Sequence, residues 1–299
     1  MWIYLAFLSA LFLGGYEIFK KVSLNGNAVI PVLFLNTFAG SLIFVPFVLI
    51  SYFSPETLQG TLFYIPRASW EVHGLIFIKS LIVLASWIFN YFATKHLPLT
   101  LSGPIKATQP VIVLIGALLI FGERLNLYQW IGVLLAVLSF YLLSLAGKKE
   151  GINFRRDKWI LFLVFAVIFG AASGLYDKYL MRSLDAMTVQ SWFNFYQFLT
   201  MIPILMLLWY PGRRKTTPFH WSWSIPLISI FLAIGDFLYF NALTYPDSMI
   251  SIVSMIRRSN VIVVFFAGAW IYKEKNLKSK VIDLVLVLTG MLFLYFGSK

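Results

Sequence analysis

The sequence predicts an all-α membrane protein with ten transmembrane helices arranged as two inverted five-helix repeats. Hydrophobic residues make up 60% of the 299 residues and charged residues only 12%, which is unlike the composition of a soluble domain. Apolar runs of about 20 residues, long enough to cross a bilayer as helices, recur along the whole chain. A pattern of polar residues in the first half returns in the second half, which indicates an internal duplication.

The expected elements follow the apolar runs in order. The ten spans are 2–20, 29–53, 72–94, 98–121, 127–146, 158–181, 186–210, 223–244, 247–272 and 277–297. Residues 1–147 form the first five-helix repeat, 148–157 a basic connecting loop, and 158–299 the second five-helix repeat. Because five is an odd number, the second repeat must insert upside down relative to the first.

Matching residues in the two halves support the duplication. Each half places a carboxylate directly after a tyrosine in its first span, and an asparagine and a proline in its second span. These residues are Gly14–Glu17 with Asn36 and Pro46 in the first half, and Gly174–Asp177 with Asn194 and Pro203 in the second. Inverted repeats share a site between the halves near the bilayer midplane, so the functional site is expected there.

Each half also carries a cation in the middle of an apolar span. In both spans a small residue precedes the cation by three positions and an amide follows it by three, which puts all three side chains on one helix face. The two sets are Gly103, Lys106 and Gln109, and Ser254, Arg257 (followed by Arg258) and Asn260. An Arg or Lys at the midplane costs about 2.5–3.5 kcal/mol. The sequence therefore predicts counter-ions, water or a negatively charged ligand inside the bundle.

Carboxylates inside the spans offer a competing explanation, because they equal the cations in number. The acids are Glu17, Asp177, Asp236 and Asp283, and the cations are Lys79, Lys106, Arg257 and Arg258. Asp236 could couple proton movement, bind a substrate ammonium group, or pair with Arg257 or Arg258. Glu17 and Asp177 could couple or serve as paired or solvated carboxylates. Asp283 and Lys79 are expected at helix ends, reaching for the interface.

Several amides and aromatic residues could complete a cavity lined by the third, fourth, eighth and ninth spans. Asn36 and Asn194 could hydrogen-bond a substrate or only link helices. The candidate aromatic lining residues are Trp87, Tyr91 and Tyr239, with Trp192 and Tyr196 as further possibilities. The pair Gly170 and Gly174 has the spacing that is typical of close helix contacts.

The composition also argues against several classes of function. The chain has no cysteine, and its three histidines are scattered, so we expect no disulfide, metal or other cofactor. No nucleophile-base-acid set or P-loop pattern occurs in the sequence, which argues against an enzyme. The net charge of +12 comes from basic residues in short loops, where lipid phosphates rather than nucleic acid are the expected partners.

The loop charges predict an orientation. One face collects 15 Lys and Arg residues, among them Lys20, Lys21 and Lys95, and the other face collects five. The positive-inside rule places the richer face in the cytoplasm. With ten spans, both termini then lie outside.

Two long stretches resemble the EamA repeats of the drug/metabolite transporter superfamily. They read "ATKHLPLTLSGPIKATQPVIVLIGALLIFGERL" and "ALTYPDSMISIVSMIRRSNVIVVFFAGAWIYKEKN" and include Gly122-Glu123-Arg124 and its counterpart Lys273-Glu274-Lys275. The resemblance implies secondary transport of small metabolites by alternating access, without ATP hydrolysis. We also expect a multi-pass protein of a bacterial inner membrane, because the sequence shows no plastid transit segment.

A shorter stretch, "IKATQP", is similar to the fourth helix of the plastid triose-phosphate translocators. Arg257-Arg258 falls where those proteins have a Lys-Arg pair. This similarity implies that Lys106, Arg257 and Arg258 are anion ligands. The chain departs from that family at Gln109, where Glu is usual, and at Gly103, where His is common.

Three hypotheses follow for the function. The first is a secondary-active transporter of an organic anion, either a phosphate ester or a carboxylate, held by Lys106 and Arg257 or Arg258. The second is a proton-coupled exporter of amino acids or amine-like compounds, in which Asp236 or Glu17 carries the proton. The third is a membrane scaffold or lipid-handling protein that transports nothing. The expected partners are a small-molecule substrate and the lipid bilayer, and the protein is expected to act as a monomer or homodimer.

Overall fold

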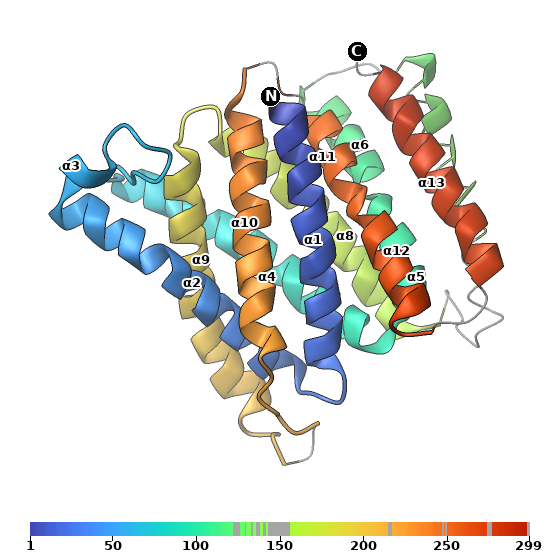
Figure 1. Cartoon of the computed structure of the whole chain (residues 1–299), viewed down its shortest axis with the longest axis horizontal. Helices are drawn as coiled ribbons and strands as arrows, with labels where there is room; N and C mark the ends of the chain where they lie inside the picture. The colour runs from blue at the N-terminus through green and yellow to red at the C-terminus, as the bar shows by residue number, and fades with distance from the viewer. Residues whose placement is uncertain are drawn as a thin grey trace.

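A computed structural model shows a bundle of helices in which both chain termini lie at the same end (Figure 1). It describes residues 1–121, 126–128, 130–132, 134–135, 138–139, 142, 156–214, 217–246, 248, 250–273 and 277–297. Within these residues every regular element is helical. The all-α fold class is therefore confirmed for the described part of the chain.

The helices follow the expected spans, with two interruptions. In the first half they are α1 (Trp2–Leu24), α2 (Val29–Phe53), the short α3 (Pro55–Leu58), α4 (Trp70–His96), α5 (Leu99–Ala107) and α6 (Gln109–Phe121). In the second half they are α8 (Lys158–Leu180), α9 (Ala186–Ile204) with a π-helical extension η1 (Leu205–Trp209), α10 (Ser224–Thr244), α11 (Ile250–Arg258), α12 (Asn260–Trp270) and α13 (Leu277–Gly297). Half of the expected span 127–146 lies outside the described residues.

Six of the described helices are long and apolar enough to cross a membrane. They are α1, α2, α4, α8, α9 with its extension, and α10. This finding supports a multi-pass membrane protein. The fourth and ninth expected spans fall short of that length because each is split into two shorter helices, α5 with α6 and α11 with α12.

The two splits occur at equivalent positions, Thr108 and Ser259, each placed between a cation and an amide. At both sites the backbone N–H and the hydroxyl of the same residue donate to a carbonyl three residues earlier. For Thr108 the acceptor is Ile105 O, at 3.2 Å from N and 2.7 Å from Oγ1. For Ser259 it is Ile256 O, at 3.0 and 2.7 Å. The expected spans 98–121 and 247–272 are thus each interrupted once. Proline does not explain both breaks, because Pro110 follows Thr108 in α6 whereas α12 contains no proline.

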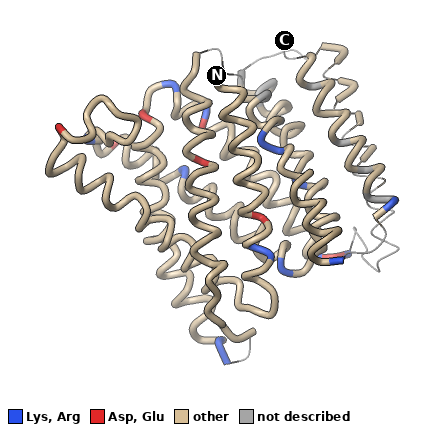
Figure 2. The backbone as a smooth tube through the Cα atoms, in the orientation of Figure 1, with Lys and Arg blue, Asp and Glu red and all other residues tan. Residues whose placement is uncertain are grey.

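The helices pack so that contacts in one half have counterparts in the other. Helix α1 packs along α10 and α4 packs along α8, while α2 packs against α9. The contact of α1 with α12 is matched by that of α8 with α6, and the contact of α5 with α12 by that of α11 with α6. The helices α5, α6, α11 and α12 therefore meet inside the bundle. Lys106, near the end of α5, and Arg257, near the end of α11, lie in its interior. Figure 2 shows charged residues inside the bundle as well as at its ends.

One end of the bundle is fastened by polar contacts between the two halves. The Asn27 side chain, in the α1–α2 turn, donates to His220 O at 2.7 Å and accepts from His220 N at 2.9 Å. Lys95 Nζ, near the end of α4, donates to Asn27 O at 2.8 Å and to Thr217 Oγ1 at 2.9 Å. The α9–α10 connection is thus held against the α1–α2 turn.

Candidate functional site

A cavity of about 130 Å³ lies among α1, α4, α8, α10 and the two broken helices. Ten of the candidate residues line it: Glu17, Trp87, Lys106, Gln109, Asp177, Asp236, Tyr239, Arg257, Arg258 and Asn260. The cavity is lined by residues of both halves of the chain, including residues next to both helix breaks. Helices α1 and α8, which correspond to the first and sixth expected spans, contribute to it in addition to the four spans that we expected.

Three other candidates do not line the cavity. The single hydroxyl of Ser229 is shared between Asn36 O and Asn36 Oδ1, at 2.9 Å each, and so links α10 to α2. Asn194 donates to Gln190 O within its own helix at 2.8 Å. Tyr91 is fully buried, and its ring centroid lies 5.3 Å from Lys20 Nζ. These side chains contact protein groups in the described structure.

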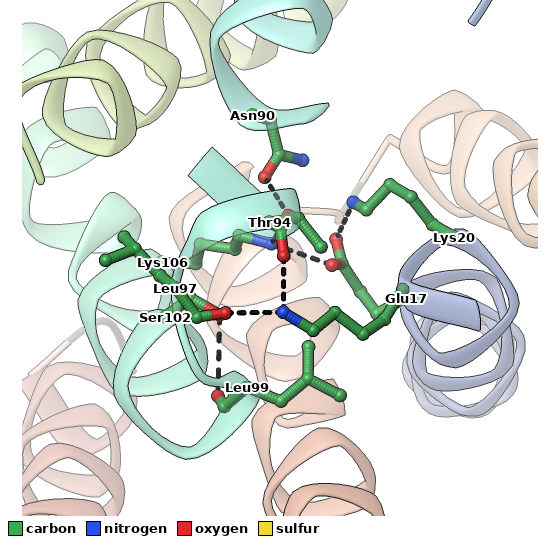
Figure 3. A network of polar contacts seen from close by, with 9 residues as sticks. Glu17, Lys20, Asn90, Thr94, Leu97, Leu99, Ser102 and Lys106 are labelled. Carbon is green, nitrogen blue, oxygen red and sulfur yellow. Dashed lines mark hydrogen bonds and ion pairs between the residues drawn. The ribbon is translucent and has the colours of Figure 1, made fainter. Parts of the chain in front are cut away.

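Glu17 lies between two lysines at one side of the cavity (Figure 3). Its Oε2 is 2.7 Å from Lys106 Nζ, and its Oε1 is 2.7 Å from Lys20 Nζ. Thr94 Oγ1 lies 3.5 Å from Lys106 Nζ. This arrangement joins α1 to α5 through one carboxylate, and it leaves Lys106 neutralised by Glu17.

The assignment of Lys20 to a cytoplasmic loop is wrong. Helix α1 continues to Leu24, so Lys20 lies within it, one turn beyond Glu17, and the side chain is fully buried. Its Nζ is 4.3 Å from the centroid of the Tyr16 ring. The Glu-x-x-Lys spacing, which pairs side chains on one helix face, was the signal that could have identified this ion pair. The neighbouring Lys21 donates to the carbonyls of Thr94 and Leu97, at 2.7 Å each.

Lys79 and Asp177 form a second buried ion pair, between α4 and α8. Tyr239 Oη donates to the same carboxylate at 3.2 Å. The placement of Lys79 at a helix end is wrong, because α4 begins at Trp70 and Lys79 lies more than two turns inside it, almost completely buried. Its Nζ faces the ring of Phe193 at 4.8 Å. The apolar residues around Lys79 gave no sequence signal for a partner on α8.

Arg257 and Asp236 form a third ion pair, between α11 and α10. The Arg257 guanidinium also lies over the Tyr239 ring, with Cζ 4.0 Å from its centroid. Asp236 is therefore a counter-ion of Arg257 in this structure, which is one of the interpretations given above.

Arg258 differs from the other cavity cations. It lines the cavity and its Nε is buried, but within the described residues it has neither an ion pair nor a hydrogen bond. The described lining therefore contains four cations, Lys79, Lys106, Arg257 and Arg258, and three carboxylates. Lys20 adds a fifth cation behind Glu17, whereas the side chain of Asp283 lies outside the described residues. The excess positive charge favours an anionic ligand, because a buried cation needs a compensating charge.

Gly170 and Gly174 line the cavity instead of serving only as a helix contact. A Cβ atom at Gly170 would lie 2.9 Å from Gln109 Oε1, so this glycine makes room for the amide. At Gly174 the nearest atom would be Tyr239 Oη at 3.9 Å. The pair shapes the cavity wall on α8.

Comparisons with known proteins agree with this architecture. A protein of Archaeoglobus fulgidus described as an uncharacterized transporter is 23% identical over 254 residues, covering 80% of this chain and 85% of that protein. A solved crystal structure superposes with a TM-score of 0.67 at 13% identity, covering 98% of this chain and 96% of the other; this likeness shows the fold alone. The profile of the EamA-like transporter family matches twice, over residues 1–145 and 157–296. The resemblance to EamA repeats is thereby confirmed, and the chain belongs to the EamA-like transporter family, within the drug/metabolite transporter superfamily.

Proposed function

We propose that the chain is a secondary-active transporter that moves a small organic anion, a phosphate ester or a carboxylate, by alternating access. The observation that carries the proposal is Arg258, a cavity cation that lacks a counter-ion among the described residues. Lys106 and Arg257 lie in the same cavity and are each held by one carboxylate. In this proposal Arg258 attracts the anion first, and the two paired cations complete its neutralisation.

The ion pairs favour one of the competing hypotheses. A proton-coupled exporter of amines needs a carboxylate that is open to the substrate or to a proton. Glu17, Asp177 and Asp236 are each bound by a cation, which supports the anion hypothesis. A scaffold needs no cavity, whereas here residues next to the breaks of two helices line one cavity. Membership of a transporter family supports a transport function rather than an enzymatic one.

The remaining features of the proposal concern the bilayer. We infer two inverted five-helix repeats, 1–147 and 158–299, in a bacterial inner membrane, with the basic end of the bundle in the cytoplasm and both termini outside. Helix contacts in the first half have counterparts in the second half, which supports the repeat. Both termini lie at the same end of the bundle, which fits an even number of membrane crossings (Figure 1). A single chain contains both halves of the cavity, so a monomer can perform the transport, and a homodimer is not required.

Transport is tested in proteoliposomes that contain the purified protein. Vesicles loaded with unlabelled phosphate esters, carboxylates, amino acids or amines are mixed outside with the labelled form of the same compound. We expect counterflow with a phosphate ester or a carboxylate, and loss of it in Arg258→Gln. The matched control is Arg67→Gln, which removes an exposed arginine outside the cavity and leaves flux unchanged.

Two results contradict the proposal. One is counterflow of amines or amino acids that follows an imposed pH gradient while anions give none, which supports the proton-coupled exporter. The other is anion flux that is equal in Arg258→Gln and the parent protein, which removes Arg258 from the site.

A further inference from the structure

The two halves share a third equivalent residue besides their acid and their cation. Tyr91-Phe92 in α4 and Tyr239-Phe240 in α10 are the same dipeptide, and each tyrosine lies seven residues before a proline that precedes a broken helix. Each half thus contributes an acid, a tyrosine and a cation. The sets are Glu17, Tyr91 and Lys106, and Asp177, Tyr239 and Arg257.

In the first half the acid is bound to the cation of its own set. Glu17 Oε2 lies 2.7 Å from Lys106 Nζ. The hydroxyl of Tyr91 is buried and makes no hydrogen bond to Glu17. The tyrosine of this set is therefore not engaged with its acid while the acid holds the cation.

In the second half the same three residues are connected in a different way. Asp177 accepts a hydrogen bond from Tyr239 Oη at 3.2 Å and pairs with Lys79 of the first half. Arg257 pairs with Asp236 instead. The guanidinium of Arg257 nevertheless lies 4.0 Å from the centroid of the Tyr239 ring. Arg257 and Asp177 thus both contact Tyr239, Arg257 through the ring and Asp177 through the hydroxyl.

The two sets therefore occupy different states in one structure. If inverted repeats exchange their conformations, the cavity opens to the opposite side. After such an exchange Asp177 pairs with Arg257, and Glu17 leaves Lys106. Tyr91 would then hold Glu17, as Tyr239 holds Asp177 here.

We propose that Glu17–Lys106 and Asp177–Arg257 form alternately during transport, and that Tyr91 and Tyr239 are positioning residues, each holding the carboxylate of its half while that carboxylate is released from its cation. This inference rests on the proposed alternating-access function and on the inverted relation of the halves. It assigns a role to Tyr91, which lies outside the cavity.

The same small substitution then has opposite effects at the two tyrosines. Tyr239→Phe removes a hydrogen bond that is present in the described state, and so favours the opposite state. Tyr91→Phe removes a hydrogen bond that forms only in the opposite state, and so favours the described one. Both variants keep the aromatic ring and differ from the parent by one oxygen atom, which makes each the matched control of the other.

The experiment measures from which side the cavity is reached. The chain has no cysteine, so Ser173→Cys places a single thiol in the cavity wall. A membrane-impermeant maleimide is added to vesicles of each orientation, and the ratio of the two labelling rates is recorded without substrate. A hydrogen bond to a carboxylate is worth enough to shift such a ratio about tenfold. We expect Tyr239→Phe and Tyr91→Phe to shift it about tenfold in opposite directions.

A shift in the same direction for both variants, in one variant only, or in neither overturns the inference. Labelling uses no substrate, so its outcome is separate from the counterflow assay. Absence of flux for every organic anion contradicts the proposed function, whereas flux with an unshifted labelling ratio contradicts the alternating ion pairs alone.

Discussion

Lys79 of α4 neutralises Asp177 of α8, so a cation of the first half holds a carboxylate of the second half inside the bundle. Both residues are buried, since Lys79 is 2% and Asp177 4% exposed. Removing two charges from water is costly, and their mutual attraction repays that cost only when both partners are present. The pair therefore makes each half dependent on the other.

Loss of Lys79 alone should destabilise the protein more than loss of both partners. Lys79→Met leaves Asp177 as a buried charge with only the Tyr239 hydroxyl, and such changes cost about 3–5 kcal/mol. The double variant Lys79→Met/Asp177→Asn should recover most of that loss. Thermal unfolding in detergent measures both. A double variant that is less stable than Lys79→Met would contradict this account.

The two adjacent arginines should behave differently on substitution. Arg258→Gln removes a cation without a described counter-ion, so we expect the unfolding temperature to stay equal or rise while the affinity for the anion falls at least about tenfold. Arg257→Gln leaves Asp236 without its partner and should lower the unfolding temperature. Binding measured by ligand-induced stabilisation separates the two effects, and equal unfolding temperatures for the two variants would refute the distinction.

The helix breaks should depend on the hydroxyl groups of Thr108 and Ser259. Thr108→Val and Ser259→Ala remove the side-chain donors to Ile105 O and Ile256 O, and we expect reduced flux with a change in stability of about 1 kcal/mol or less. Thr37→Val is the control, because Thr37 Oγ1 makes the same type of bond to Phe34 O within the unbroken α2. If all three variants transport equally, these hydroxyls do not maintain the breaks.

The α8 glycines should limit the size of the substrate. Gly174→Ala fits without a clash, since the nearest atom would be 3.9 Å from the new Cβ, but it narrows the cavity. We expect the KM of the largest transported anion to rise by several fold while that of the smallest is unchanged. Gly170→Ala would press on Gln109 Oε1 at 2.9 Å, so it should impair transport of every anion. An identical pattern for both variants would argue against these positions shaping the cavity.

The sequence predicted the membrane-spanning helical fold and the family because both rest on local patterns. Apolar run lengths located the ends of α2, α8 and α10 within a few residues. Spacing by three grouped Lys106 with Gln109, and Arg257 with Asn260. The structure brings all four to the same cavity, although a helix break lies between the members of each pair.

The pairing of charges could not be predicted in the same way. Asp177 is paired with Lys79, 98 residues away in sequence, and this choice depends on how α4 packs along α8. Equal numbers of acids and cations gave no means to decide which ones meet. The count of charged residues inside the spans also omitted Lys20, because a lysine near the end of an apolar run looks the same in sequence whether it is buried or solvated. The helix breaks were missed because Thr and Ser are common within unbroken membrane helices.

Three lysines near one end of the bundle have contacts that complicate their use as markers of orientation. Lys20 is enclosed against Glu17, Lys21 donates to two carbonyls, and Lys95 bridges Asn27 and Thr217. Positive residues next to a span bias its direction of insertion, at a stage when the spans have not yet packed. In the folded protein the same three ammonium groups bind carboxylate, carbonyl and hydroxyl groups of the chain. Replacing them would disturb biogenesis and the finished bundle at separate times, and pulse-chase kinetics can tell those two defects apart.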